Sequence, residues 1–234
     1  TYYIRAYATN SAGTGYGAEF SIKTANATGT VTDVDGNTYT TVKIGNQWWM
    51  AQNLKTTKYR GGAAIPNVTD NDAWKDLTEG AYSWFANDAG TNGNTYGALY
   101  NWYAINHGDL CPTGWHVPTD NEFKELEMFL GMSQAQANAA GWRGTDQGNQ
   151  LKSTTLWATG NAGTNSSGFN ALPGGYRYYE NGTFQGLEAF GSFGTATEWS
   201  STTYIYRQLK NDLSTVLRMD AEKTAGFSVR CVQD

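Results

Sequence analysis

Cysteine, histidine and proline are scarce in this chain of 234 residues, which holds two Cys, two His and four Pro. A zinc site needs three or four suitable ligands, and the two histidines, His107 and His116, only bracket Cys111. No C-x-x-C pair is present, which argues against a thiol redox centre. We expect His116, which lies in a strand-like stretch, to be a hydrogen-bonded structural residue rather than a metal ligand.

Charge is sparse as well, with charged residues at 16% and a formal net charge of −5. The chain has no basic run, so its composition argues against nucleic acid or an anionic membrane as a partner. No apolar run approaches the ~20 residues of a membrane-spanning helix, so we expect no membrane insertion by this chain.

The common catalytic signatures are also missing. Neither a G-x-S-x-G nucleophile elbow nor a phosphate-binding glycine loop occurs. A glycosidase needs two carboxylates about 5–10 Å apart. Glu180, Glu188 and Glu198 lie in an expected loop region, but their spacing does not pair them, and we interpret them as surface acids. We therefore expect no catalytic residue and no cofactor, with room left for a structural calcium ion.

What the chain does have is glycine and aromatic residues: 28 Gly, nine Trp and 15 Tyr. This profile is typical of a loop-rich extracellular β or α+β protein. The length suits one large domain, or one domain with an appendage, and is enough to bury a sizeable core.

The clearest local unit runs from Cys111 to Gly131, CPTGWHVPTDNEFKELEMFLG. Thr119 and Glu122 form an S/T-x-x-E capping box, which predicts a helix start. Apolar residues follow at helical spacing, and Gly131 is a plausible stop. A second capping box, Ser133 to Gln136, predicts a shorter helix that ends near Gly141. The predicted apolar face of the first helix consists of Phe123, Leu126, Phe129 and Leu130.

The two cysteines, Cys111 and Cys231, have the even count expected of a secreted chain with one disulfide. A bond between them would tie the entry of the main helix to the last strand. The alternative is a pair of buried free thiols.

The first 24 residues predict a β-hairpin, because polar and apolar positions alternate on both sides of the turn at residues 10–15. The stretch TYYIRAYATNSAG resembles the last two strands of a fibronectin type III-like domain. We expect residues 1–24 to be that hairpin, residues 25–29 to be a linker, and the chain to be part of a longer protein.

A second hairpin is predicted at Asp35-Gly36, with another turn at Gly45-Asn46. Asp33, Asp35 and Asn37 do not have the spacing of a calcium-binding loop, because the glycine follows directly after the second Asp. We interpret this segment as a plain turn.

Seven blocks, in order from about residue 30 to residue 234, resemble the Fibrobacter succinogenes major paralogous domain family. They are TDxDGNxY at 32–39, VKIGNQWWMAQNL at 42–54, YGALYNW at 96–102, CPTGWHVP at 111–118, GFNALPGGYR at 168–177, WSST at 199–202 and GFSVRCV at 226–232.

The resemblance implies a bacterial domain, secreted or at the cell surface, over residues 30–234. The implied fold is α+β and C-type lectin-like, with small antiparallel sheets, one main and one short helix, and a long loop region at residues 141–198. The fold is related in shape to that of formylglycine-generating enzymes. Their activity is not implied, because Cys111 and Cys231 are assigned to a structural bond.

Calcium-dependent lectins carry Glu-Pro-Asn or Gln-Pro-Asp and a Trp-Asn-Asp motif, and neither occurs here, although Asn211-Asp212 matches the end of the second. Aromatic and polar side chains in the expected loop region are our candidate ligand site. Flat rings suit the apolar faces of sugars and the centres of protein interfaces. The alternative is that each ring is core or merely exposed. The candidates are Trp157, Arg177, Tyr178, Tyr179 and Glu180.

These observations favour a non-catalytic binding or adhesion module whose ligand is a carbohydrate or an extracellular protein. Two alternatives stay open: an enzyme acting on polysaccharide, and a structural cap with no soluble ligand.

Overall fold

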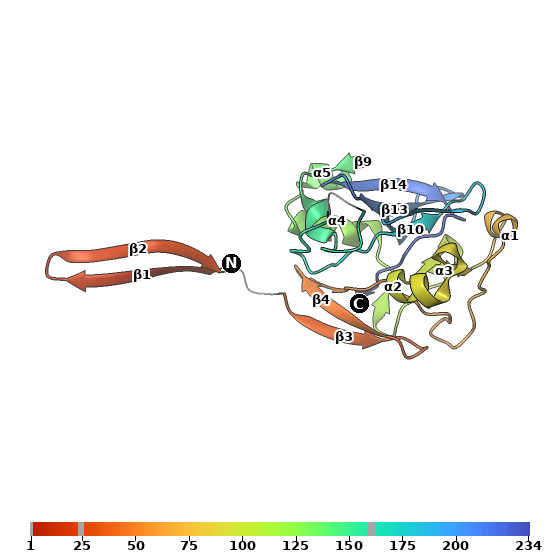
Figure 1. Cartoon of the computed structure of the whole chain (residues 1–234), viewed down its shortest axis with the longest axis horizontal. Coiled ribbons are helices and arrows are strands. Elements are labelled where there is room, and N and C mark those ends of the chain that lie inside the picture. The colour runs from red at the N-terminus through yellow and green to blue at the C-terminus, as the bar shows by residue number, and fades with distance from the viewer. Residues whose placement is uncertain (1, 23–25, 159–161) are drawn as a thin grey trace.

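The computed structural model describes residues 2–22, 26–158 and 162–234. Figure 1 shows a two-stranded ribbon that stands apart from a larger body of sheets and several short helices. The chain is thus a mixed helix and sheet protein with many strands, few and short helices, and an N-terminal hairpin. No helix among the described residues is long and apolar enough to cross a membrane.

The N-terminal ribbon pairs β1 (Tyr2–Asn10) with β2 (Gly13–Ile22) in antiparallel register, as predicted. The side chains of residues 3–20 are all exposed, so neither face of the ribbon is covered. The expected linker at 25–29 is only partly a linker, because Thr28 and Gly29 begin the next strand. Residues 23–25 lie outside the described part of the chain.

The smaller sheet of the main body has five strands in the order β3-β4-β5-β15-β8. The predicted turns at Asp35-Gly36 and Gly45-Asn46 join its first three strands. The last strand of the chain inserts between β5 and β8, so this sheet closes only when the C-terminal segment is in place. The strands are β3 (Thr28–Thr32), β4 (Thr38–Ile44), β5 (Gln47–Met50), β8 (Trp115–His116) and β15 (Val232–Gln233).

The larger sheet has six strands in the order β11-β10-β12-β13-β14-β9. Only the β10–β12 pair is parallel. The strands are β9 (Gly141–Arg143), β10 (Gly174–Arg177), β11 (Phe184–Leu187), β12 (Phe190–Glu198), β13 (Thr203–Lys210) and β14 (Val216–Glu222).

The prediction of one long loop region at 141–198 was therefore wrong. Four strands and the helix α6 (Gln147–Leu151) fall within it, and among the described residues the longest parts without helix or strand are 152–158 and 162–173. Glycines weaken the sequence signal of two of these strands: β10 begins Gly174-Gly175, and Gly191 and Gly194 lie within β12. The strand β13 was not predicted, because Arg207 and Gln208 break its apolar alternation although both are buried.

Both predicted capping boxes are present. Thr119 and Glu122 cap α4 (Asp120–Phe129), and Ser133 and Gln136 cap α5 (Gln134–Asn138). The second helix ends three residues short of Gly141. The remaining elements surround the hairpin of β6 (Tyr82–Trp84) and β7 (Ala98–Tyr100). They are α1 (Asn71–Lys75), a 3₁₀ turn (Phe85–Asn87), a π turn (Ala89–Gly93), α2 (Asn94–Tyr96) and α3 (Trp102–Ile105).

The predicted apolar face of α4 was wrong at one position. Phe129 is 61% exposed and lies against Gly45, whereas Glu127 is fully buried. Helical spacing alone cannot show this, because a buried carboxylate depends on cations supplied by distant strands.

Those cations are three arginines from the larger sheet. Glu127 accepts from Arg143 Nη2 (2.5 Å) and Arg207 Nε (2.7 Å). Asp120 accepts from Arg218 Nε and Nη2 at 2.8 and 2.7 Å. Burial alone would raise the pKa of the Asp120 carboxyl, but Arg218 and Arg207 hold it well below its usual range. Paired charges of this kind fasten α4 to β9, β13 and β14.

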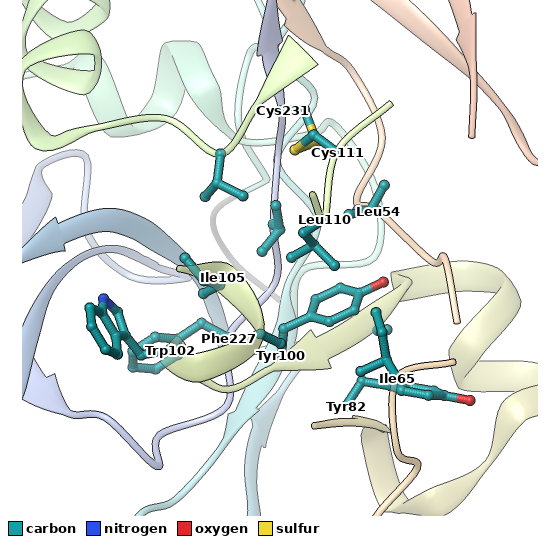
Figure 2. Packing of buried hydrophobic residues seen from close by; sticks show 14 of the residues in the cluster. Leu54, Ile65, Tyr82, Tyr100, Trp102, Ile105, Leu110, Cys111, Phe227 and Cys231 are labelled. Atoms are coloured by element: carbon teal, nitrogen blue, oxygen red, sulfur yellow. A yellow bond between two sulfur atoms is a disulfide. The ribbon is translucent and has the colours of Figure 1, made fainter. Parts of the chain in front are cut away.

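The disulfide between Cys111 and Cys231 is present, with a Cα–Cα distance of 6.0 Å. It belongs to a buried hydrophobic cluster that also contains Leu54 and Leu110, and Figure 2 shows the sulfurs near these two side chains. The bond connects the entry of β8 to the C-terminal segment, as expected.

Replacing Glu127 by Gln should lower the free energy of unfolding by about 3–5 kcal/mol, because two buried guanidinium groups then lose their counter-charge. Urea denaturation measures this difference. The matched control is Glu125→Gln on the exposed side of the same helix, which should change stability by no more than about 0.5 kcal/mol. Equal losses in the two variants would contradict the account of the ion cluster.

Replacing Cys111 and Cys231 together by Ser should lower the free energy of unfolding by about 2–5 kcal/mol, because the unfolded chain regains the freedom of a loop closed over 120 residues. Guanidinium denaturation of the variant measures the loss. The wild-type chain in excess reductant serves as the control and should unfold at the same denaturant concentration as the variant. A midpoint unchanged from that of the oxidised chain would refute the prediction.

Candidate binding surface

The five candidate ligand residues do not gather into one site. Trp157 and Arg177 are buried, Tyr178 and Tyr179 are half-buried, and Glu180 is exposed. Only the last three present side-chain surface to a ligand.

Trp157 belongs to the core between the irregular segment and β12. Its Nε1 donates to Ser153 Oγ (3.1 Å) and to the carbonyl of Ala171 (3.3 Å), and its ring packs against Gly191. Because its polar atom is satisfied internally and its ring faces the core, Trp157 stabilises the fold and displays no surface for a sugar.

Arg177 is a positioning residue beneath the turn that follows β10. Its guanidinium stacks on Trp74 (4.2 Å) and Phe184 (4.7 Å). Burial lowers the pKa of this guanidinium to about 10. The group donates to the carbonyls of Val68, Thr69, Asp70 and Gly182. It thereby fixes the turn against residues 68–71.

The turn itself joins β10 to β11 and contains Asn181-Gly182, a residue pair typical of tight hairpin turns. Gly182 has a φ of 67°, and a Cβ there would lie 2.1 Å from the carbonyl oxygen of Asn71, so no other residue fits. Asn181 Oδ1 accepts from the backbone N–H and the hydroxyl of Thr183. The turn is therefore held rigidly on both sides.

Phenol groups gather at this turn. The rings of Tyr178 and Tyr179 lie 4.7 Å apart, and the Tyr179 hydroxyl donates to Glu180 Oε1 (3.2 Å). Hydrogen bonding to Glu180 raises the pKa of the Tyr178 hydroxyl, so this group stays a neutral donor at any physiological pH. Tyr176 meets Tyr178 edge to face at 6.5 Å.

Tyr206 on β13 extends the same surface. Its ring stacks on Phe227 at 4.5 Å, which in turn contacts Tyr176 at 6.4 Å. Burial, with the charges of Tyr176, Asp220 and Tyr179, raises the pKa of Tyr206 to about 12. We call Tyr176, Tyr178, Tyr179, Glu180 and Tyr206 the tyrosine surface.

Sequence reasoning missed Tyr176 and Tyr206 as members of this surface. Tyr176 lies on β10, and Tyr206 lies on β13, the strand that was not predicted. No local signal pointed to Tyr206, because the polar side chains of Arg207 and Gln208 interrupt the apolar pattern of this strand although both are buried.

The described residues contain no group of three or more His, Cys, Asp or Glu side chains placed to hold a metal ion. The Asp33 carboxylate already accepts from the backbone of Asp35 and Asn37 and from the Tyr39 hydroxyl. Asp35 accepts from Thr56 and Thr57 and pairs with Lys58. Both carboxylates are thus engaged in hydrogen bonds and an ion pair within the protein. This agrees with the interpretation of the segment as a plain turn.

His116 is likewise a structural residue, because both of its ring nitrogens are engaged by carboxylates. Its Nδ1 lies 2.6 Å from Asp234 Oδ1 and its Nε2 lies 2.7 Å from Glu122 Oε1. Glu122 Oε2 accepts from the N–H of Thr119 in the capping box. The imidazole therefore joins the last strand to the start of α4.

Residues 42–233 match the Fibrobacter succinogenes major domain. The chain belongs to that family. The matched region runs from within β4 to β15 and includes the whole tyrosine surface and both cysteines, whereas β1, β2 and β3 lie outside it. Searches of curated proteins and of solved structures return no match for this family member.

In this Fibrobacter succinogenes major domain, the hydrogen bonds of the His116 imidazole make the stability of the fold depend on pH. Burial opposes protonation of His116, but the hydrogen bonds to Asp234 and Glu122 outweigh burial and raise its pKa above the usual 6.5. Protonation therefore favours the folded state. We expect the full stabilisation below about pH 6.5, and its loss as the pH rises through the folded-state pKa.

Chemical denaturation across pH 5–9, a range in which histidine titrates, tests this expectation. His116→Asn should flatten the decline in stability above pH 6.5, whereas His107→Asn should leave it in place, because His107 stacks on Tyr59 away from both acids. Identical pH profiles for the His116→Asn variant and the wild type would exclude the role of this imidazole.

Proposed function

We propose that this chain is a non-catalytic, extracellular binding module with a C-type lectin-like fold, and that the tyrosine surface is where it takes a carbohydrate or an extracellular protein. The supporting observation is that four phenol rings from β10, the β10–β11 turn and β13 lie on a rigid base. The buried Arg177 holds that base in place.

The chemistry of the tyrosine surface suits recognition better than catalysis. Tyrosine presents a broad ring and a hydroxyl with little loss of conformational freedom, which is why it is common at binding sites. Glu180 is engaged by Tyr179, and Glu198 forms an ion pair with Lys223, so the acids that a glycosidase would use have other partners.

An oxidising compartment is part of the proposal. A disulfide that closes a loop of this length is typical of secreted and surface proteins and rare in the cytosol. The mixed, aromatic and weakly acidic surface fits the same setting, with neither nucleic acid nor a membrane as partner.

The test is an array of glycans and extracellular matrix proteins probed with the purified chain, with calcium and again with chelator. A reproducible ligand should lose at least about tenfold in affinity when Tyr178 and Tyr179 are both replaced by Ala, because the exposed rings of the turn are then gone. Dependence on calcium would add a metal to the proposal.

A matched control exists in the ribbon. Tyr7 and Tyr16 are exposed and also form a tyrosine pair, with ring centroids 6.3 Å apart, but they lie outside the family domain. Tyr7→Ala with Tyr16→Ala should leave binding unchanged. Unaltered capture by the Tyr178 and Tyr179 variant would overturn the assignment of the site, and sugar release from polysaccharide mixtures would favour the enzyme instead.

A further inference from the structure

A small hollow lies at the far edge of the larger sheet, away from the tyrosine turn in strand order. Its volume is about 110 Å³, and it lies beside the loop between β12 and β13. We call it the Trp199 hollow; its lining residues are Ala140, Gly141, Trp199, Ile205, Arg218, Met219 and Asp220.

Exposed apolar side chains collect around this hollow. Trp199 is 60% exposed and Met219 is 52% exposed, and both line it. Trp142, 39% exposed, follows directly after the lining residue Gly141. An exposed indole removes much apolar area from water when a ligand covers it, so the placement of Trp199 favours a binding role.

The loop holds the indole in place without burying it. The backbone N–H groups of Trp199 and Ser200 both donate to the carbonyl of Thr203, at 2.9 and 3.1 Å. Lys223 anchors the loop from the next strand, through the carbonyl of Ser201 and the carboxylate of Glu198. A platform fixed in this way loses little freedom when a ligand binds.

The inner wall is equally rigid. Arg218 donates to both oxygens of Asp120 and to the carbonyl of Asn138, and its guanidinium lies 6.0 Å from the centre of the Trp199 ring. Because Arg218 is committed to the buried ion cluster, it shapes the wall of the hollow and is not free to clamp an anion.

The free polar group at the rim is Asp220. Its carboxylate accepts no hydrogen bond and forms no ion pair with any of the residues that the structure describes. The strand β9 pairs with β14 only over Val216–Arg218, so Asp220 stands on a sheet edge that β9 does not reach. A carboxylate in this position is an acceptor for hydroxyl groups of a ligand.

We propose that the Trp199 hollow binds one pyranose ring of a neutral carbohydrate, with the apolar face of the sugar on Trp199 and its hydroxyl groups donating to Asp220. An anionic ligand would meet the Asp220 charge, whereas the Arg218 charge beside the ring is already paired with Asp120. A neutral ring with an apolar face and several hydroxyls matches both Trp199 and Asp220. This inference rests on the carbohydrate form of the proposed function and adds a second contact point to it.

The test is saturation-transfer NMR on the whole 234-residue chain with the methyl pyranosides of glucose, galactose, mannose and xylose as probes. At least one should bind the wild type. Trp199→Ala should weaken that binding at least about tenfold, Trp199→Tyr should recover part of it, and Asp220→Asn should weaken it severalfold. Phe129→Ala is the control, because Phe129 is an exposed aromatic residue on α4 that lies outside the lining, and it should leave binding unchanged.

Three results would overturn the inference: no transfer from any probe, equal losses from Trp199→Ala and Phe129→Ala, or binding that Trp199→Ala leaves intact. The Tyr178→Ala, Tyr179→Ala variant in the same titration separates the two sites. If only that variant loses probe binding, the tyrosine surface is the sugar site and the proposal for the Trp199 hollow is wrong. If only the Trp199 variants lose probe binding, the Trp199 hollow is established as a sugar site. The tyrosine surface is then tested separately by the array of glycans and matrix proteins.

Discussion

The ion pairs between α4 and the larger sheet are the constraint on which much of this molecule depends. Asp120 and Glu127 lie within a helix, and the arginines that neutralise them come from three strands that are 14 or more residues further along the chain. Neither side can be buried without the other. The pairing therefore fixes where α4 lies on the sheet, and it also holds Arg218 as the wall of the Trp199 hollow.

Buried basic side chains also hold the irregular segments in place. Arg230 is fully buried, and it donates to the carbonyls of Met50, Phe169 and Asn170 and to the side chain of Asn53. Lys152 donates to three carbonyls between residues 210 and 213. Buried carbonyl groups need hydrogen-bond donors, and loops lack the regular backbone hydrogen bonds through which neighbouring strands supply them. In this chain long basic side chains perform that task, which explains why a protein with few charges buries so many of them.

The local units could be read from the sequence, because their determinants lie within a few residues of one another. Thr119 with Glu122, Ser133 with Gln136, and Asn181 with Thr183 each form contacts within a single turn. The disulfide was predictable in the same limited way, since only two cysteines exist. The strand β13 and the place of Trp157 in the core were not predictable, because both depend on partners distant in the sequence, such as Ala171 for Trp157 and Phe193 for Arg207.

The candidate sites show the same division between features that the sequence predicts and features that only the structure shows. The aromatic richness of the chain and the turn at Tyr178 and Tyr179 were evident in the sequence, but exposure was not. Trp157 and Trp199 both lie in segments rich in threonine, yet the first is buried and the second is exposed. By itself the sequence determined the family, the capped helices, the tight turns and the single sulfur bond, because these follow from local spacing and residue count. Only the tertiary structure decided which rings and charges reach the surface, because burial is a property of the partners that folding brings together.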